Sequence, residues 1–259
     1  GATVVTEDTS TIALVTGAGK RIGRAIALDL AVHGFTIAVH ANTSKDESEE
    51  TASIIRDAGG KAEVFLGDLT EPDVPAKLID SVTKSLGAPR VVINNASIFE
   101  ADFADDFDPE LFDRHMAVHV KAPTLLAAAM AEALARNEDG LVVNMIDQRV
   151  KRLTPNFFSY TLSKSALWTA TRTMAMAYAP KIRINAIGPG PTIKSARQSD
   201  EEFAKQVKAV PLERSPELGE FGATIRYFWA NKSVTGQMIA LDGGQHLAWE
   251  TPDVMDIEE

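Results

Sequence analysis

The sequence has no cysteine, and this absence excludes disulfide bonds and thiolate metal sites. It also lacks any run of about 18 apolar residues, the length that a membrane-spanning helix needs, so no membrane partner is predicted. The first ten residues, GATVVTEDTS, have neither the basic start nor the long apolar centre of a signal peptide. We therefore expect a cytoplasmic protein whose residues 1–10 form a flexible N-terminal tail.

Basic residues are fewer than acidic ones, with 26 Lys and Arg against 36 Asp and Glu. The formal net charge of −10 at pH 7 argues against nucleic acid as a general partner. The acidic run EADFADDFDPE at 100–110 has a spacing compatible with cation ligands, but a solvated loop before a helix explains it better. Asp108 or a neighbour would then be the N-cap of that helix. We predict no metal site and a small-molecule substrate.

Short apolar segments alternate with segments of helical length along most of the 259 residues. Segments such as GLVVNMI and KIRINAI are apolar almost throughout, as strands buried on both faces are. The alternation predicts an α/β fold in a single domain, a doubly wound parallel sheet of the Rossmann type with about seven strands flanked by helices. The expected strands are 11–16, 35–40, 62–66, 90–94, 141–146, 181–187 and 237–241, and the expected helices are 22–33, 46–58, 72–86, 109–135, 158–178 and 217–230.

The domain is expected to cover residues 11–249, without internal repeats or long linkers. Residues 190–216 are a polar, proline-containing insertion that we interpret as a substrate lid. Residues 250–259 form an acidic C-terminal tail. Sheets of this kind bind ligands at the carboxyl ends of their strands, where the strand order reverses.

The stretch TGAGKRIGRAIA follows the first expected strand and opens the first expected helix. Its glycines Gly17, Gly19 and Gly23 let backbone N–H groups approach a pyrophosphate, and the helix N-terminus adds positive potential. The G-x-G-x-x-G spacing would need glycine at position 22, which is Ile22. A tight turn without a ligand is the alternative, but the strand-turn-helix context favours nucleotide binding.

The residues around this turn favour NADP(H) over NAD. The second expected strand ends without the carboxylate that holds a ribose 2′-hydroxyl, since His40, Ala41 and Asn42 stand there. Lys20 and Arg21 supply cations that suit a 2′-phosphate. Ordinary solvated side chains are the alternative interpretation of this pair.

Tyr160 and Lys164 are four residues apart, which places them on one face of the expected helix. An ammonium beside a phenol favours the phenolate and makes the tyrosine an acid/base near neutral pH. The pattern is common on helix surfaces, so its position matters: it begins the helix after the fifth expected strand.

The whole arrangement resembles the short-chain dehydrogenase/reductase family over about residues 11–244. Motifs typical of that family occur in the family order along the chain. They are the glycine turn, GDL at 67–69, NNAS at 94–97, the Tyr160-x-x-x-Lys164 pair, INAIGPG at 184–190 and TGQMIALDGG at 235–244.

The resemblance implies roles for individual residues. Asp68 and Leu69 would border the adenine, Tyr160 would transfer the proton, and Lys164 would hold the nicotinamide ribose. Asn95 and Ala96 would line the cofactor, and Pro189, Gly190 and Thr192 would flank the nicotinamide. With the turn and the end of the second strand, the full set of cofactor-binding candidates is Gly17, Gly19, Lys20, Arg21, Ile22, Gly23, His40, Asn42, Thr43, Ser44, Asp68, Leu69, Asn95, Ala96, Ser97, Tyr160, Lys164, Pro189, Gly190 and Thr192.

Three departures from the family pattern narrow the resemblance. The usual turn has glycine where Arg21 stands, the serine 13 residues before the tyrosine is Asp147, and the usual NNAG is NNAS, ending in Ser97. Together they resemble the pteridine reductases and the bacterial dihydromonapterin reductases. That resemblance implies that Arg21 meets both the cofactor phosphate and the pterin, and that Phe99 sandwiches the pterin against the nicotinamide. A core or lid phenylalanine is the alternative for Phe99.

Asp147 could take part in proton delivery to a ring nitrogen or accept from the amino-pyrimidine edge of a pterin, where serine would bind a carbonyl. A turn-capping aspartate is the alternative. The expected substrate-binding residues are Arg21, Ser97, Phe99, Asp147 and Tyr160.

His119 stands where the family commonly has an asparagine that relays protons to the lysine. Histidine can both donate and accept, so we include it among the catalytic candidates Asp147, Tyr160, Lys164 and His119. A satisfied buried histidine is the alternative. The stretch after His40 lacks an arginine, which leaves Thr43, Ser44 and Lys45 as candidates for the 2′-phosphate.

The hypothesis is an NADPH-dependent reductase of a C=N bond in a dihydropterin-like ring. A carbonyl reductase, such as a 3-oxoacyl thioester reductase, is the alternative, and a non-catalytic NADP-binding regulatory protein is a second one. The helical segment APTLLAAAMAEALA and the helix starting near Tyr160 have small and apolar residues on more than one face. We expect a homo-oligomer, a dimer or a tetramer.

Overall fold

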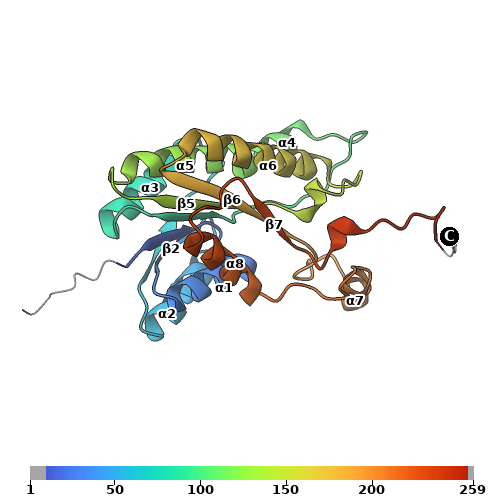
Figure 1. The fold of residues 1–259 in the computed structure, drawn as a ribbon, viewed down its shortest axis with the longest axis horizontal. Coiled ribbons are helices and arrows are strands. Elements are labelled where there is room, and N and C mark those ends of the chain that lie inside the picture. The colour runs from blue at the N-terminus through green and yellow to red at the C-terminus, as the bar shows by residue number, and fades with distance from the viewer. Residues whose placement is uncertain (1–9, 256–259) are drawn as a thin grey trace, which may run out of the picture.

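The computed structural model describes residues 10–255 and contains a seven-stranded parallel sheet in the order β3-β2-β1-β4-β5-β6-β7. Helices cover both faces of the sheet (Figure 1). The order reverses between β1 and β4, which pair directly. The predicted doubly wound α/β fold is confirmed. The strands are β1 (Ile12–Val15), β2 (Thr36–Ala41), β3 (Ala62–Leu66), β4 (Val91–Asn94), β5 (Gly140–Met145), β6 (Ile182–Pro189) and β7 (Met238–Leu241).

Three helices, α1, α2 and α8, lie on one face of the sheet, and α3, α4, α5 and α6 lie on the other (Figure 1). A further helix, α7, lies beyond the carboxyl ends of the strands. The helices are α1 (Arg21–Val32), α2 (Lys45–Asp57), α3 (Val74–Ser85), α4 (Pro109–Met116), α5 (Ala122–Ala133), α6 (Phe158–Tyr178), α7 (Asp200–Lys208) and α8 (Gly219–Ala230).

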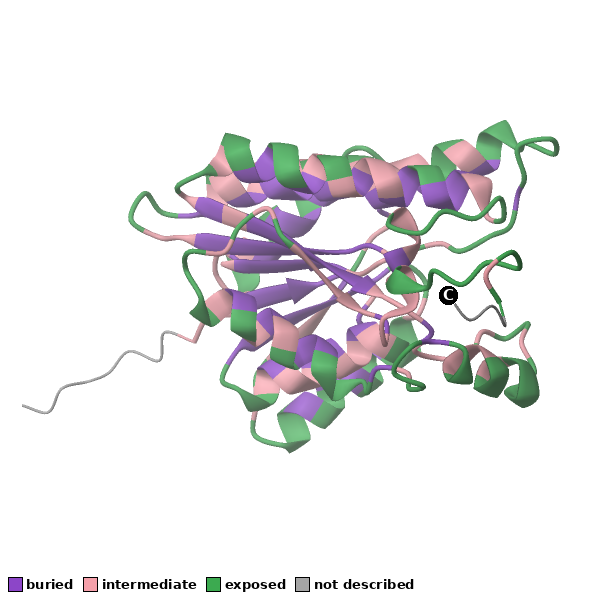
Figure 2. Cartoon of the chain, turned by 45° about the vertical axis from the view of Figure 1, so that its right-hand side comes forward, coloured by how far each residue is buried: buried purple, intermediate pink, exposed green. Residues whose placement is uncertain are grey.

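Both faces of the central strands are buried (Figure 2). In β1, Ala13 and Val15 pack into the core beneath α1 and α8, whereas Leu14 packs into the core beneath α3 and α5. Successive strand residues point to opposite faces, so a strand covered by helices on both sides must be apolar throughout. This explains why the apolar segments predicted the strands.

The structure divides the expected helix 109–135 into α4, a π-helical turn over Ala117–Lys121, and α5. At the junction Ala122 N–H donates to the Ala117 carbonyl, five residues back. Pro123 follows and has no N–H to continue the α-helical pattern, so the backbone takes one wider turn. Asp108 is the N-cap of α4 and accepts from two backbone N–H groups, which confirms the expected cap.

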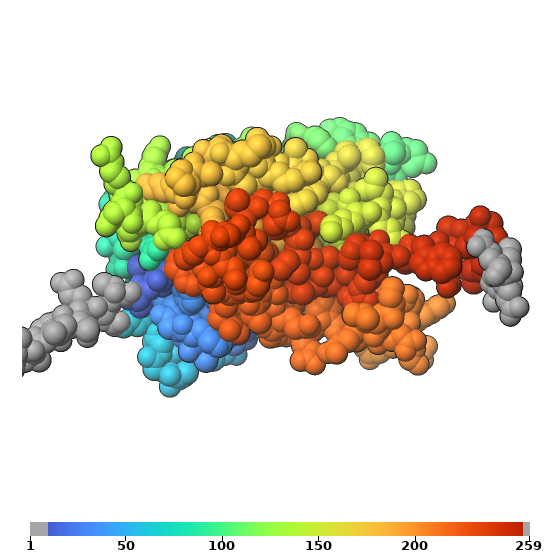
Figure 3. Space-filling model, in the orientation of Figure 1, coloured from blue at the N-terminus to red at the C-terminus, as the bar shows by residue number. Residues whose placement is uncertain are grey.

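The segment 190–216 contains a helix that was not predicted from the sequence. Ser199 Oγ accepts from the Glu202 N–H at 3.1 Å, and the Glu202 carboxylate accepts from the Ser199 N–H at 2.8 Å. This capping box starts α7, which has no buried residue. In Figure 3, α7 (orange) lies at the surface on the same side as the C-terminal segment (red). Of the expected tails 1–10 and 250–259, residues 1–9 and 256–259 lie outside the described part of the chain, whereas residues 250–255 are described and mostly exposed.

Candidate active site

The site forms at the carboxyl ends of β1, β4 and β5, next to the reversal of strand order. The glycine turn follows β1 and packs against the loop after β4. Gly17 has φ +61°, and a Cβ there would lie 3.0 Å from Ala96 Cα. A Cβ on Gly23 would lie 2.1 Å from the Gly17 carbonyl oxygen. Neither position can hold a side chain, so both glycines are needed for the turn to pack this closely against its neighbours.

Thr16, at the end of β1, ties the turn to the loop after β4. Its Oγ1 accepts from the backbone N–H groups of Asn95 at 3.0 Å and Ala96 at 2.9 Å. The Asn95 side chain donates to the Gly17 carbonyl at 3.1 Å. The structure therefore brings together three of the cofactor-binding candidates, Gly17, Asn95 and Ala96.

Arg21 begins α1 with φ +56°, a left-handed conformation that favours glycine. The left-handed backbone conformation explains why the family usually has glycine at this position. Arginine adopts the same conformation here at the cost of backbone strain. The Arg21 guanidinium reaches the Ile193 carbonyl in the loop after β6 at 3.5 Å. Lys20 is the N-cap of α1 without a side-chain cap, and the first turn holds no acid. This helix end is electrostatically suited to a phosphate.

His40 lies beneath the glycine turn rather than at its surface, with 1% of its area exposed. Its Nδ1 accepts from the Gly17 N–H at 3.2 Å, so the proton is on Nε2, 2.9 Å from the Gly67 carbonyl. Burial lowers the pKa of His40. The side chain therefore supports the turn. Asn42 and Thr43 are exposed and Ser44 is half-buried at the start of α2, where a 2′-phosphate would lie.

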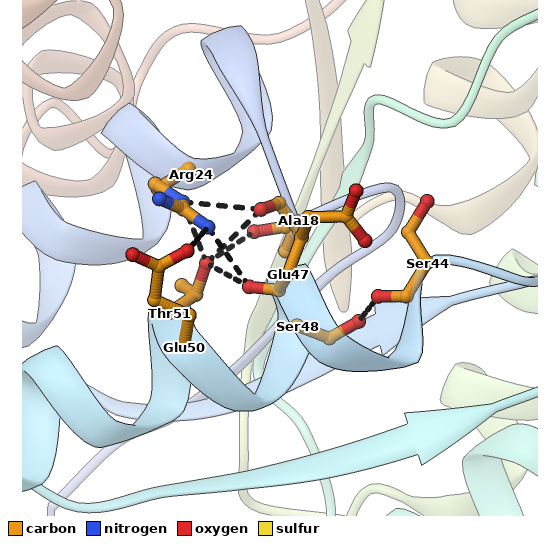
Figure 4. Close-up of polar contacts among 8 residues, drawn as sticks. Ala18, Arg24, Ser44, Glu47, Ser48, Glu50 and Thr51 are labelled. Atoms are coloured by element: carbon orange, nitrogen blue, oxygen red, sulfur yellow. Dashed lines mark hydrogen bonds and ion pairs between the residues drawn. The ribbon is translucent and has the colours of Figure 1, made fainter.

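Arg24 and Thr51 fasten the turn to α2 (Figure 4). Arg24 Nε lies 3.0 Å from both the Gly19 carbonyl and Thr51 Oγ1, and its Nη2 reaches Glu50 at 2.9 Å. Thr51 Oγ1 lies 3.2 Å from the Ala18 carbonyl. These contacts hold the carbonyls of the turn away from the ligand side.

Asp68 follows β3 and is fixed by Thr70, whose backbone N–H and hydroxyl donate to Asp68 Oδ1 at 2.9 and 2.7 Å. Leu69 is buried. After β6, a Cβ on Gly190 would lie 2.6 Å from Asp242 Cα, so these two backbones touch.

Pro189 and Thr192 flank Gly190. Thr192 Oγ1 donates to the Gly190 carbonyl at 3.0 Å, which closes a turn at the carboxyl end of the sheet. The residues that the resemblance assigned to the nicotinamide thus lie in one short loop.

Tyr160 and Lys164 lie in the first turns of α6, beside the end of β5. The Tyr160 hydroxyl donates to Asp147 Oδ2 at 3.0 Å. Lys164 Nζ donates to the Met145 carbonyl at 2.7 Å and lies 5.7 Å from the centroid of the Tyr160 ring. The candidate catalytic residues are therefore adjacent.

The charges around the phenol differ from the sequence expectation. Burial and then the Asp147 carboxylate raise the pKa of Tyr160 well above its usual value, whereas the Arg149 guanidinium lowers it. Burial lowers the pKa of Lys164 to about 8, and the charge of Asp147 acts in the opposite direction. Tyr160 keeps its proton, contrary to the expectation that Lys164 favours the phenolate. Burial is the main reason, and in addition the Asp147 carboxylate rather than the Lys164 ammonium faces the hydroxyl.

His119 joins the loop after β4 to α6. Its Nε2 lies 2.7 Å from Ser97 Oγ and accepts from the Ile98 N–H at 3.3 Å. Its Nδ1 lies 2.7 Å from Ser163 Oγ, which donates to the Tyr160 carbonyl at 2.9 Å. Because Nε2 accepts and Ser163 has used its proton, the hydrogen of the neutral ring is on Nδ1.

The environment of His119 keeps the ring uncharged. Burial, followed by the charges of Lys164 and His115, lowers the pKa of His119 well below its usual value. Within residues 10–255 no hydrogen bond joins His119 to Lys164, so the Lys164 ammonium acts on the ring only at a distance, by opposing its protonation.

Phe99 stacks on Phe157, with ring centroids 4.2 Å apart and an interplanar angle of 11°. It also meets the Tyr160 ring edge-on at 4.7 Å. Phe99 remains 43% exposed. It is therefore a lining residue of the site rather than a core residue, whereas its expected sandwich with a pterin stays a prediction.

Asp102 lies in the acidic run that was expected to be a solvated loop, but its side chain is buried. Its Oδ1 accepts from the Ser159 N–H at 2.8 Å, and its Oδ2 accepts from the Ser159 hydroxyl. Ser159 N–H is one of the donors that the first turn of α6 leaves without a helical partner. Asp102 thus fixes the start of the helix that holds Tyr160.

Sequence reasoning also missed Arg149 and Phe157. Arg149 stands in DQRVKR, where a run of cations is typical of a solvated surface. Phe157 has φ +57° and begins α6 in a conformation that the sequence does not signal for phenylalanine. Only the position of Arg149, two residues after Asp147, pointed toward the site.

A nucleotide-binding turn and a Tyr–Lys pair at one edge of a doubly wound sheet define an oxidoreductase of the dinucleotide-dependent class. A family model for enoyl-(acyl carrier protein) reductase matches residues 17–246. The chain belongs to the short-chain dehydrogenase/reductase family, which confirms the resemblance.

Solved structures and curated relatives agree with this assignment. A structure of FolM alternative dihydrofolate reductase 1 from Brucella canis, complexed with NADP, is 57% identical, with a TM-score of 0.92 over 94% of this chain and 97% of that chain. The Brucella suis protein, also with NADP, is 56% identical, with a TM-score of 0.92 over 95% of this chain and 98% of that one. The 3-oxoacyl-[acyl-carrier-protein] reductase FabG of Staphylococcus epidermidis is 26% identical over 91% of this chain and 98% of its own.

Among residues 10–255, no helix combines the length and apolar content that crossing a membrane requires. In the same part of the chain, no three His, Asp or Glu side chains gather in a way that could hold a metal ion.

Proposed function

We propose that the protein reduces a C=N bond of a dihydropterin-like ring, with NADPH as the hydride donor. The observation that carries the proposal is the hydrogen bond from Tyr160 to Asp147, where the family usually has a serine. The two FolM structures, which are 57% and 56% identical, support the same substrate class.

The glycine turn suits the pyrophosphate of NADP(H), because a turn of glycines between a strand and a helix N-terminus lets backbone N–H groups approach a phosphate. The uncapped start of α1 faces the same place. Arg21 and Lys20 suit a 2′-phosphate, together with Thr43 and Ser44 at the start of α2. When bound, the cofactor supplies the hydride, and the protein supplies position, charge and a proton.

Tyr160 donates the proton. Hydride addition to the carbon of a C=N bond leaves a strongly basic nitrogen, which a phenol can protonate even when its own pKa is high. Burial and Asp147 hold Tyr160 in this protonated form. The resulting phenolate is offset by the nearby cations Lys164 and Arg149, and solvent returns the proton.

Asp147 orients the phenol through its Oδ2, while its Oδ1 accepts from the Arg149 backbone N–H at 2.8 Å. A carboxylate held this way can also accept from an amino group of the substrate. His119 acts from behind the site, where it links the exposed Ser97 hydroxyl to Ser163 beneath Tyr160. Because of this placement, we assign His119 the role of relaying protons to the site. His119→Asn, which restores the residue common in the family, is the informative replacement.

A 3-oxoacyl thioester reductase is the alternative function. The FabG relative supports it, at 26% identity. Asp147 counts against it, because a carboxylate would repel the developing oxyanion that a serine hydroxyl stabilises. A regulatory protein without turnover is a weaker alternative, since the Tyr160–Asp147 contact and Lys164 are in place.

The protein is also proposed to form a homodimer or homotetramer in the cytoplasm, with no nucleic-acid partner. On the outer face of α6, Leu162 and Met176 are 41% and 74% exposed, which suits a second copy of the chain.

The experiment is a substrate panel. Purified protein is mixed with NADPH and, in turn, dihydrobiopterin, dihydromonapterin, a quinone, a ketone and acetoacetyl-CoA, and absorbance reports NADPH oxidation. Turnover with a dihydropterin supports the proposal. Turnover confined to carbonyl substrates would replace it with the alternative, and no turnover with any substrate would favour the regulatory protein.

A further inference from the structure

The Arg149 side chain lies among three aromatic rings, one of which is that of the proposed proton donor Tyr160. Its guanidinium carbon lies 5.2 Å from the ring centroid of Phe157 and 5.5 Å from those of Phe99 and Tyr160. The three rings lie around one cation, each within the distance at which a cation–π contact is favourable. Its backbone is held too, because the Arg149 N–H donates to Asp147 Oδ1 at 2.8 Å.

The guanidinium nevertheless lacks an acceptor. Nη1 of Arg149 is shielded from solvent and has no hydrogen-bond partner among residues 10–255. Across the same residues, no carboxylate forms a salt bridge with this side chain. A buried donor without an acceptor is costly, and aromatic faces satisfy only the charge, not the directional N–H groups. An oxygen placed at this point would remove that cost.

We propose that Arg149 is a substrate-binding residue that donates a hydrogen bond to an acceptor oxygen of the substrate. The inference rests on the proposed function for the nature of the substrate. The oxygen belongs either to the oxo group of the pterin ring or to a carboxylate on its side chain, and one guanidinium can bind either.

The location separates this role from that of the other arginine of the site. Arg21 starts α1 at the phosphate end, whereas Arg149 lies against Tyr160 and Phe99 at the proton-transfer end. A purely structural clamp would need only the ring contacts. It would not need a shielded N–H without an acceptor next to the reacting hydroxyl.

The experiment compares wild type with Arg149→Met, Arg149→Lys and the control Arg152→Met. Arg152 is exposed, three residues further on, and its replacement removes the same charge. KM and kcat are measured for dihydrobiopterin, which has the ring oxo group alone, and for dihydrofolate, which has carboxylates as well. Dissociation constants for NADPH are measured alongside.

We expect KM to rise by about 10- to 100-fold in Arg149→Met, the effect of losing a charged hydrogen bond. Arg149→Lys should give an intermediate rise, and Arg152→Met no rise. NADPH affinity should not change. A rise in KM for both substrates identifies the ring oxygen as the acceptor. A rise in KM for dihydrofolate alone identifies the carboxylate.

An unchanged KM for both substrates would overturn the inference. So would a loss of kcat at constant KM, because that result would confine Arg149 to tuning Tyr160. If Arg149→Met does not fold, Arg149→Lys decides by the same criteria. If wild type reduces acetoacetyl-CoA but neither pterin, the proposed function fails. The KM for acetoacetyl-CoA, compared between wild type and the Arg149 variants, then decides whether Arg149 binds an oxygen of that substrate. A wild type that reduces none of the three would overturn both.

Discussion

The Tyr160 hydroxyl donates its hydrogen bond to Asp147 Oδ2 at 3.0 Å, although the family usually places a serine at position 147. The contact joins a strand end to a helix start, and burial together with the Asp147 carboxylate raises the pKa of Tyr160, so that the phenol keeps its proton. A tyrosine held in this form is a proton donor, which is the role that reduction requires.

Replacing Tyr160 by Phe removes the donor and keeps the ring that packs on Phe99. We expect kcat to fall by about 10²- to 10⁴-fold, the usual contribution of a positioned acid. NADPH affinity should remain, since the hydroxyl contributes one contact among many. Stopped-flow turnover and fluorescence titration measure the two quantities. Retention of wild-type turnover would refute the acid role.

Replacing Arg21 by Gly tests two properties of one residue. The backbone at φ +56° suits glycine, so the unfolding free energy should stay level or rise by up to about 1 kcal/mol. The loss of the guanidinium should weaken NADPH by about 10-fold or more, and NADH less. Calorimetric titration gives both dissociation constants. Equal weakening of the two cofactors would contradict the phosphate assignment.

The buried Lys164 predicts opposite effects of alkaline pH on stability and activity. Its pKa falls from 10.5 in the unfolded chain to about 8 in the folded protein, so between these values the unfolded state binds more protons and stability rises with pH. Relative to Lys164→Met, wild type should gain about 3 kcal/mol over this window. Below it, both states are charged and the full cost of burial remains.

Urea unfolding of the cofactor-free proteins measures this difference. In parallel, kcat/KM of wild type should fall as pH rises past 8, because the ammonium that offsets the phenolate loses its proton. A stability difference independent of pH would show that Lys164 is not held with a lowered pKa.

Asp102 should matter through the position of α6. Asp102→Ala leaves the buried Ser159 N–H without an acceptor and should lower the unfolding free energy by about 1–3 kcal/mol. Tyr160 lies in the same helical turn, so kcat should fall as well. Asp105→Ala, an exposed change in the same loop, is the matched control. Equal stability of the two variants would remove the capping role.

The sequence predicted the sheet well because strands buried on both faces are apolar throughout, and Ala13, Leu14 and Val15 show this directly. It did not predict α7, whose capping box at Ser199 and Glu202 starts a helix without a buried face. A helix that buries nothing leaves no apolar period in the sequence.

The site was predictable where chemistry follows spacing along the chain. Tyr160 and Lys164 were found in this way, Asp147 was found through the family resemblance, and the structure brings the three together. Arg149 was not found, because its distinction comes from rings that other segments supply. The charge state of Tyr160 was wrong for a related reason. The spacing placed Lys164 near the phenol, but it could not show that the Lys164 ammonium donates to the Met145 carbonyl and not to the phenol.

The most direct measurement follows deuterium from NADPH labelled at both C4 positions into dihydrobiopterin, with mass spectrometry of the product. The account predicts a single deuterium in the reduced pterin ring for wild type, formed in step with NADPH consumption, and almost none for Tyr160→Phe. NADPH consumption that leaves the pterin unlabelled, or labelling that continues at the wild-type rate in Tyr160→Phe, would contradict it.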